Sequence, residues 1–115
     1  MCGRFEIHSA IEIIAKLFGI THLAFDFPTS YNIAPSQDVL LVVENGERRF
    51  LRGRWGFIPP WSKEPLTGYR MINAKAETLA EKASFRDAFA KQRCLVVADG
   101  FFEWKKEGAG KQPYY

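Results

Sequence analysis

The sequence has little cysteine, little histidine and no long apolar run, and each shortage excludes a class of protein. Its two cysteines, Cys2 and Cys94, form no CxxC pair, so we expect neither a disulfide framework nor a metal site. No apolar stretch approaches the ~20 residues of a bilayer span, and the amino terminus lacks a basic-then-apolar signal segment. We therefore expect no metal, no cofactor and no membrane contact, and a cytoplasmic location, nucleoid-associated if the source is bacterial.

The length of the chain limits the number of domains, and its charge indicates which partners are favoured. A chain of 115 residues, 47% of them hydrophobic, can form one domain with a modest core. The formal net charge is +3 and the isoelectric point is near 9.0. This balance favours a polyanionic partner without requiring one, because many enzymes are mildly basic.

The most reactive group that the sequence offers is its second residue. Removal of Met1 would leave Cys2 first, with a thiol and a free α-amine on adjacent carbons. The α-amine has a reference pKa of about 7.7–8.0, so part of it is neutral and nucleophilic in the cytosol. Together the two groups can capture an aldehyde, first as an imine and then as a thiazolidine ring. The alternative is that a cysteine at this position is incidental.

The first third of the chain predicts a strand, a helix and a loop. A strand is expected at 3–7, followed by a helix that a capping box of Ser9 and Glu12 begins and that ends near Phe18, before Gly19. The apolar stripe of this helix comprises Ile11, Ile14, Ala15 and Phe18. Residues 20–36 are expected to be a loop because Pro28 and Pro35 oppose regular pairing.

The middle of the chain predicts a hairpin and an aromatic loop. Residues 39–44 and 47–55 read as strands joined by a two-residue Asn45-Gly46 turn. One face of the return strand carries Arg48, Phe50, Arg52 and Arg54, which is either a basic binding stripe or a solvated face. In the loop 56–68, Trp61 follows two prolines and precedes Pro65; it either stacks on a nucleic-acid base or folds over the core.

The last third predicts short elements around one carboxylate. Residues 73–78 should pass from strand to helix, Ser84 should cap a second short helix, and Cys94–Ala98 should be a buried strand with Cys94 in the core. A strand at 101–105 follows the Asp99-Gly100 turn and sets Glu103 among aromatic residues. A carboxylate there is either satisfied by a buried donor or suited to proton transfer, so Glu103 is the candidate acid/base.

Taken together, the motifs resemble those of the SOS-response-associated peptidase domain family. The similarity rests on six motifs in order and approximate spacing: Met1-Cys2-Gly3-Arg4-Phe5, Tyr31-Asn32-Ile33-Ala34-Pro35, Arg54-Trp55-Gly56, Pro60-Trp61, Ile72-Asn73-Ala74-Lys75-Ala76-Glu77-Thr78 and Ala98-Asp99-Gly100-Phe101-Phe102-Glu103-Trp104. It implies an α+β fold, a distorted β-barrel of mostly antiparallel strands with short flanking helices. It also implies that the protein shields abasic sites in single-stranded DNA through a covalent bond to the terminal cysteine.

The resemblance assigns roles to individual residues. It implies that Cys2 forms the thiazolidine with the abasic aldehyde, that Asn73 orients the Cys2 amine and that Glu103 moves protons. It implies a DNA-binding surface that includes Arg4, Asn32, Trp61 and Lys75. Lys75 departs from the family pattern, in which arginine is common, and a lysine lacks the bidentate fork of arginine.

The resemblance also implies that residues 1–115 are a single, incomplete domain. Domains of this family are about twice as long, and a catalytic histidine in their second half has no counterpart here, because His8 and His22 lie in other motifs. We expect self-association or a complementary carboxy-terminal polypeptide, since the strand at 101–105 would lack cover. Three functions stay open: abasic-site crosslinking with lyase-like cleavage, thiol peptidase or self-processing activity, and nucleic-acid binding by an inactive fragment.

Overall fold

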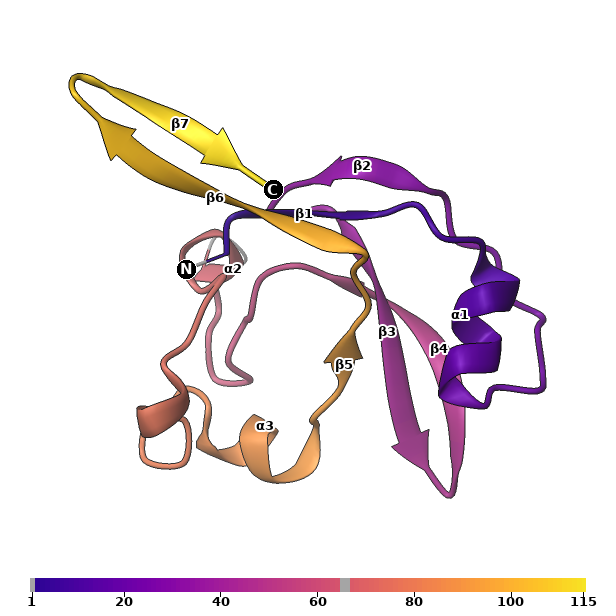
Figure 1. Cartoon of the computed structure of the whole chain (residues 1–115). Coiled ribbons are helices and arrows are strands. Elements are labelled where there is room, and N and C mark those ends of the chain that lie inside the picture. Colours follow the sequence, from indigo (N-terminus) through magenta and orange to yellow (C-terminus); the bar gives the residue numbers. More distant parts are fainter. Residues whose placement is uncertain (1, 65–66) are drawn as a thin grey trace.

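The computed structural model describes residues 2–64 and 67–115, in which the strands curl into a half-barrel flanked by short helices (Figure 1). Met1, whose removal the sequence predicts, and Pro65 lie outside the described residues. The elements are β1 (Arg4–Ile7), α1 (Ile11–Phe18), β2 (Ser30–Ile33), β3 (Asp38–Asn45), β4 (Glu47–Arg54), α2 (Thr67–Arg70), the 3-10 helix η1 (Ala76–Thr78), α3 (Arg86–Lys91), β5 (Leu95–Val96), β6 (Gly100–Glu107) and β7 (Gly110–Tyr114). The predicted α+β class and the barrel-like antiparallel arrangement are confirmed.

The first sheet has the strand order β2-β1-β6-β7 and is antiparallel throughout. It holds the amino terminus between two neighbours, because Phe5 pairs with Ile33 of β2 and with Phe101 of β6. The prediction that residues 20–36 are all loop was wrong over Ser30–Ile33. Pro28 and Pro35 lie outside this strand, so neither removes a hydrogen-bond donor from it.

The second sheet has the strand order β4-β3-β5, and its β3–β4 hairpin confirms the predicted one. The turn differs in detail, because Asn45 pairs with Glu47 and leaves Gly46 alone between them. Gly46 has φ of +81°, a conformation that glycine adopts without the steric cost of a Cβ atom. The pairing therefore centres on Gly46 and is not that of a two-residue loop.

The core lies between the two sheets and α1. Phe5, Ile7 and Ile33 contribute from the first sheet, Val39, Leu40, Val42 and Phe50 from the second. Helix α1 adds the predicted stripe, with Ile14 and Ala15 buried and Ile11 and Phe18 packed at its edge, and Gly19 ends it at φ of +67°. In the described part of the chain, no helix is long and apolar enough to cross a membrane.

The capping box was a wrong prediction. Helix α1 has Ala10 at its N-cap position and no side-chain hydrogen bond there. The hydroxyl of Ser9 instead donates to Asp99, 90 residues away, at 2.5 Å. A tertiary partner with a full negative charge has displaced the local one.

Three further predictions after residue 66 need correction. No strand leads into Asn73, which follows the short helix α2, although η1 lies in the expected place. Ser84 does not cap α3; Phe85 holds that position, and its ring packs 5.2 Å from that of Phe57. The stretch Cys94–Ala98 is not a buried strand, because β5 has only two residues and only Val97 is buried.

The strand expected at 101–105 is paired on one side only at each of its residues. Strand β6 pairs with β1 over residues 100–102 and with β7 over residues 103–107. An open apolar edge belongs to β5, whose Leu95 and Val96 are 57% and 53% exposed. Strand β5 pairs with β3 on one side, and no described strand pairs with its other side.

Candidate functional site

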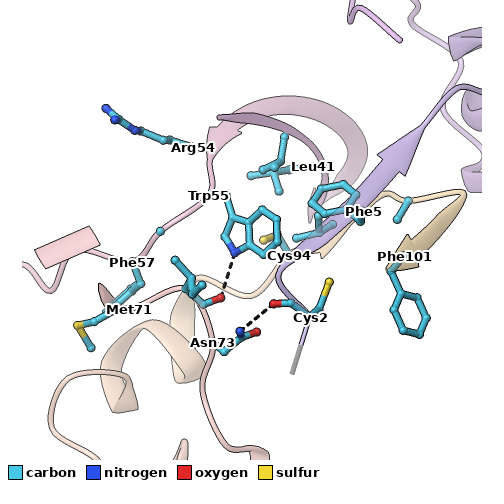
Figure 2. Close-up of a pocket in the computed structure, with 15 residues that line it drawn as sticks. Cys2, Phe5, Leu41, Arg54, Trp55, Phe57, Met71, Asn73, Cys94 and Phe101 are labelled. Atoms are coloured by element: carbon cyan, nitrogen blue, oxygen red, sulfur yellow. Dashed lines mark hydrogen bonds between the residues drawn. The ribbon is translucent and has the colours of Figure 1, made fainter. Parts of the chain in front are cut away.

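The amino terminus borders a largely apolar cavity of about 600 Å³ between the two sheets (Figure 2). Its lining includes Cys2 and Asn73 and four aromatic rings, those of Phe5, Trp55, Phe57 and Phe101. In Figure 2 the side-chain amide of Asn73 points toward the backbone carbonyl of Cys2, while the thiol of Cys2 points away from Asn73 and Arg54 extends away from both. The cavity therefore places a thiol and an amide beside an apolar wall that can exclude water.

Hydrogen bonds fix both the side chain and the backbone carbonyl of Cys2. Its thiol donates to the carbonyl oxygen of Arg4 at 3.5 Å, and its carbonyl oxygen accepts a 2.9 Å hydrogen bond from Nδ2 of Asn73. Strand β1, which follows at once, is fixed by β2 on one side and by β6 on the other. The half-buried thiol thus stands at the end of one of the most constrained strands in the fold.

Trp55 connects the segments that carry Cys2 and Asn73. Its Nε1 donates to the carbonyl oxygen of Ile72 at 3.0 Å, one residue before Asn73. Its ring lies 5.2 Å from that of Phe5, three residues after Cys2. The Arg54-Trp55-Gly56 motif by itself predicts no role for Trp55, because the bond to Ile72 joins residues 17 apart in the sequence.

Gly56 allows the close approach that follows Trp55. It has φ of +140°, and a Cβ atom there would lie 2.4 Å from the carbonyl oxygen of Gly68. No residue with a side chain fits that gap without moving the backbone. The turn brings the chain after β4 back toward the segment that carries Asn73, where Phe57 bonds to Met71 through the backbone.

Glu103 lies on the neighbouring strand and not in the lining of the cavity. The antiparallel pairing of β1 with β6 ends at Arg4 and Phe102, and Glu103 is the next residue of β6. Strand alternation places it on the same face as Phe101, which does line the cavity. The half-buried Glu103 is thus near the terminus, and its part in proton transfer stays a prediction.

The four predicted DNA-binding residues are spread over the surface. Nη1 of Arg4 donates to Oδ1 of Asn32 at 2.8 Å, so these two form one unit on adjacent strands. Trp61 is 67% exposed and does not fold over the core. Lys75 is exposed, and its carbonyl oxygen anchors η1 by accepting from the backbone of Thr78.

The arginines of β4 act largely within the protein. Arg48 pairs with Glu44 at 2.8 Å and also donates to the carbonyl of Phe18. Arg52 pairs with Asp38 at 3.4 Å, and its guanidinium lies over the ring of Phe27. These contacts neutralise much of the predicted basic stripe and fix the loop after α1 to β4.

Cys94 is exposed, contrary to the expectation that it is a core residue, and it lines the same cavity as Cys2. Partial burial raises the pKa of its thiol. A raised pKa leaves less reactive thiolate at neutral pH. As an internal residue Cys94 also has no α-amine, which makes it a matched control for Cys2.

A polar cluster that no motif in the sequence predicts joins β1 and the residues after it to Asp99 and Tyr115. The carboxylate of Asp99 accepts from the backbone amides of His8 and Ser9 at 2.6 and 2.8 Å, and Glu6 accepts from the hydroxyl of Tyr115 at 2.5 Å. The bond to Glu6 raises the pKa of Tyr115. Burial raises the pKa of Asp99, but hydrogen bonds from Ser9 and His8 outweigh it and hold that pKa below the usual value. In the described residues, no group of histidine, cysteine and carboxylate side chains could hold a metal ion.

Comparison with known proteins gives consistent matches over this chain. Abasic site processing protein YoqW of Bacillus subtilis (strain 168) is 46% identical over 109 residues, which are 92% of this chain and 49% of that protein. Abasic site processing protein YedK of Escherichia coli (strain K12) is 37% identical over 122 residues, covering 100% of this chain and 53% of that protein. A solved structure of a phage-related protein from Bordetella bronchiseptica has a TM-score of 0.78 at 32% identity, covering 99% of this chain and 54% of that one.

The chain thus spans about half the length of the curated relatives it matches. The sequence profile described as SOS response associated peptidase (SRAP) matches residues 1–115, the whole of the sequence. This chain therefore belongs to the SOS response associated peptidase family.

Proposed function

We propose that this chain processes abasic sites in single-stranded DNA by capturing them covalently on Cys2. The observation that carries the proposal is the pairing of Cys2 with Asn73 at the mouth of an apolar cavity. The relatives named abasic site processing proteins, at 37–46% identity, support the same substrate class.

The chemistry follows from the two groups of an amino-terminal cysteine. After removal of Met1, the neutral amine of Cys2 adds to the aldehyde carbon of the ring-opened abasic sugar and expels water to form an imine. The Cys2 sulfur then attacks the imine carbon, a C–S bond forms, and the imine nitrogen takes up a proton. The product is a thiazolidine that joins protein and DNA by two bonds to one carbon.

Asn73 and Glu103 assist these steps in different ways. Asn73 holds the carbonyl of Cys2, which restricts how the adjacent amine and thiol are presented. Glu103, the residue that follows the Arg4–Phe102 pair on β6, supplies and removes protons as water leaves and the ring closes. Glu103 acts through proton transfer, whereas Asn73 acts through position.

Four residues, the half-buried Arg4 and three exposed ones, form the surface that holds the DNA. Arg4 and Asn32 present one bonded pair, and Lys75 adds a further charge for phosphates. Trp61 stacks on an unpaired base, a contact worth roughly 1–3 kcal/mol. Single-stranded DNA should therefore bind better than continuous duplex, and affinity should fall as salt rises.

The test is incubation with single-stranded oligonucleotides that contain or lack one abasic site. We expect a heat-stable adduct with the abasic strand alone, lost in Cys2→Ala and retained in Cys94→Ala, whose thiol lines the same cavity. Noncovalent binding should be nearly unchanged in both variants. An undiminished adduct in Cys2→Ala would overturn the proposal.

Two other functions give different outcomes in this assay. Salt-sensitive binding to both strands without any adduct would indicate a binding fragment. Cleavage of peptides without an adduct would indicate a thiol peptidase, although neither His8 nor His22 lines the cavity beside Cys2. Abasic-site crosslinking also has a lyase-like variant, in which the imine leads to cleavage of the DNA strand. A hydride reductant would trap the imine as a stable amine and so detect this variant.

The proposed partner besides DNA is a polypeptide that covers the open apolar surface. Val96 of β5 and Ile13 and Leu17 of α1 are exposed around one hollow of the surface, and the exposed Leu95 precedes Val96 on the same strand. A complementary carboxy-terminal polypeptide or a second copy of the chain would bury them.

A further inference from the structure

We propose that one face of the β6–β7 hairpin is a second contact surface for single-stranded DNA, which extends the path of the strand away from Cys2. This hairpin face consists of Trp104, Lys106, Lys111 and Pro113. The proposal deepens the proposed function and rests on it for the direction in which the DNA runs. The binding itself does not depend on covalent capture.

The pairing register defines which side chains share this face. Trp104 lies opposite Pro113 and Lys106 lies opposite Lys111. Side chains alternate along a strand, so Lys105 and Glu107 lie on the other face. There Nζ of Lys105 is 3.4 Å from Oε1 of Glu107, which also accepts from the hydroxyl of Tyr114.

The two lysines of the hairpin face are an unfavourable pair in the free protein. Like charges directly opposite on two strands destabilise a hairpin. Neither Lys106 nor Lys111 has an ion-pair partner among the residues that the structure describes. The one carboxylate of the hairpin tip, Glu107, is turned to the opposite face. A polyanion laid across the pair would relieve the repulsion and use both charges at once.

Trp104 links the lysines to the reactive terminus. Its indole is 41% exposed, and a Cβ atom on Gly3 would lie 3.9 Å from its Cζ3. It therefore lies beside the backbone that follows Cys2. Along β6 the lysine pair begins two residues farther, which is about 7 Å at the usual strand rise.

The same sheet face also contains residues already assigned to DNA. Phe102 pairs with Arg4, whose side chain is bonded to Asn32 on β2. Across the sheet the order is Asn32 on β2, Arg4 on β1 and Phe102 on β6. Along β6, Trp104 and then the lysine pair follow Phe102. Aromatic rings interleaved with basic side chains suit a single strand, whose unpaired bases stack while its phosphates bind cations.

The shape of the molecule agrees with this path. Beyond its pairing with β1, strand β6 continues with β7 as a hairpin that projects from the half-barrel (Figure 1). A projecting hairpin with a basic and aromatic face can reach nucleotides that the cavity at Cys2 does not contact.

The experiment measures noncovalent binding of single-stranded DNA without an abasic site as a function of salt. The test variant is Lys106→Gln/Lys111→Gln. The matched control is Lys105→Gln/Lys91→Gln, which removes the same charge from the opposite hairpin face and from the exposed end of α3. Loss of two phosphate contacts should reduce the slope of log K against log salt by about 1.4 and weaken binding about tenfold at low salt.

Two further measurements separate binding from folding and from net charge. The melting temperature of Lys106→Gln/Lys111→Gln should stay equal or rise, because the cross-strand repulsion is gone. Trp104→Leu should weaken binding to all sequences similarly, because stacking reads no base. The effect of the lysine variant should vanish with oligonucleotides too short to extend past Trp104.

The outcomes distinguish this proposal from the proposed function. An absent adduct with abasic DNA would sink the proposed function and leave the salt titration interpretable. An unchanged salt slope in Lys106→Gln/Lys111→Gln with a raised melting temperature would assign the lysines to protection of the edge strand β7, and would overturn this inference. Equal losses in the control variant would overturn it as well.

Discussion

The side-chain amide of Asn73 donates a 2.9 Å hydrogen bond to the carbonyl oxygen of Cys2, across 71 residues of sequence. The carbonyl carbon of Cys2 is bonded to its α-carbon, which bears both the amine and the CH2–SH side chain. Fixing it therefore restricts rotation about the bonds that aim both nucleophiles. The contact is to the carbonyl oxygen, and that Asn73 orients the amine through it stays a prediction.

Replacing Asn73 should slow the chemistry and spare the binding. In Asn73→Ala the lost hydrogen bond, worth about 0.5–1.5 kcal/mol, predicts a crosslinking rate about 2- to 10-fold lower at saturating DNA. The dissociation constant for DNA without an abasic site should be unchanged. Asn32→Ala is the contrasting variant, since it frees Arg4 and should weaken binding with a normal rate at saturation. A weakened affinity with a full rate in Asn73→Ala would contradict the positioning role.

Trp55 should affect the crosslinking rate at saturating DNA by holding the segment that carries Asn73. Trp55→Phe keeps a ring against Phe5 but removes the N–H that bonds to Ile72. We expect a rate reduction similar to that of Asn73→Ala, and no added reduction when the two changes are combined, because both act through one contact. Trp61→Phe keeps a stacking ring on an exposed loop and should leave the rate unaltered. Additive effects of Trp55→Phe and Asn73→Ala would show independent roles.

Asp99 should make the folding stability of the protein depend on pH in the acidic range. Hydrogen bonds from Ser9 and His8 hold its folded-state pKa below 3.8, so its stabilisation is complete above that value and is lost as pH falls through the folded pKa. His8, Glu6 and Tyr115 are the other titratable groups around it. Asp99→Asn should lower stability at pH 7 by on the order of 1–2 kcal/mol.

Thermal melts from pH 7 to pH 2.5 test this. The gap in melting temperature between the wild type and Asp99→Asn should narrow below about pH 4, as the wild-type carboxylate takes up a proton. A gap that stays constant over this range would mean that the charge of Asp99 contributes nothing.

The open edge of β5 should control association. Because Leu95 is exposed on an apolar edge, we expect the isolated chain to self-associate at micromolar concentrations, measurable by light scattering. Leu95→Lys should shift the population toward monomer, since a charged side chain on an edge strand opposes pairing with another chain. Leu51→Lys is the control, because Leu51 is also partly exposed but lies on β4. A monomeric wild type would remove the basis for a partner at this edge.

Local sequence patterns were sufficient to predict an element wherever neighbouring residues all favour the same structure. The β3–β4 hairpin follows from an apolar run, a glycine and a second run, and α1 follows from a stripe at helical spacing that ends at Gly19. The motifs around Cys2 and Asn73 identified the family, because their order and spacing are carried by the sequence alone. In each case the information lies within a few residues, or in the order of short motifs.

Contacts between residues far apart in the sequence determined the features that local patterns did not predict. Ser9 carries a local capping signal, yet it bonds to Asp99, and the hydrogen bond to a charged acceptor outweighs a neutral local one. Strand β2 exists because β1 offers it hydrogen bonds between two prolines, and one edge of β5 is open because no described strand pairs with it. The bonds of Asn73 and Trp55 likewise join segments far apart in the chain, and no local pattern encodes which distant carbonyl an amide or indole will reach.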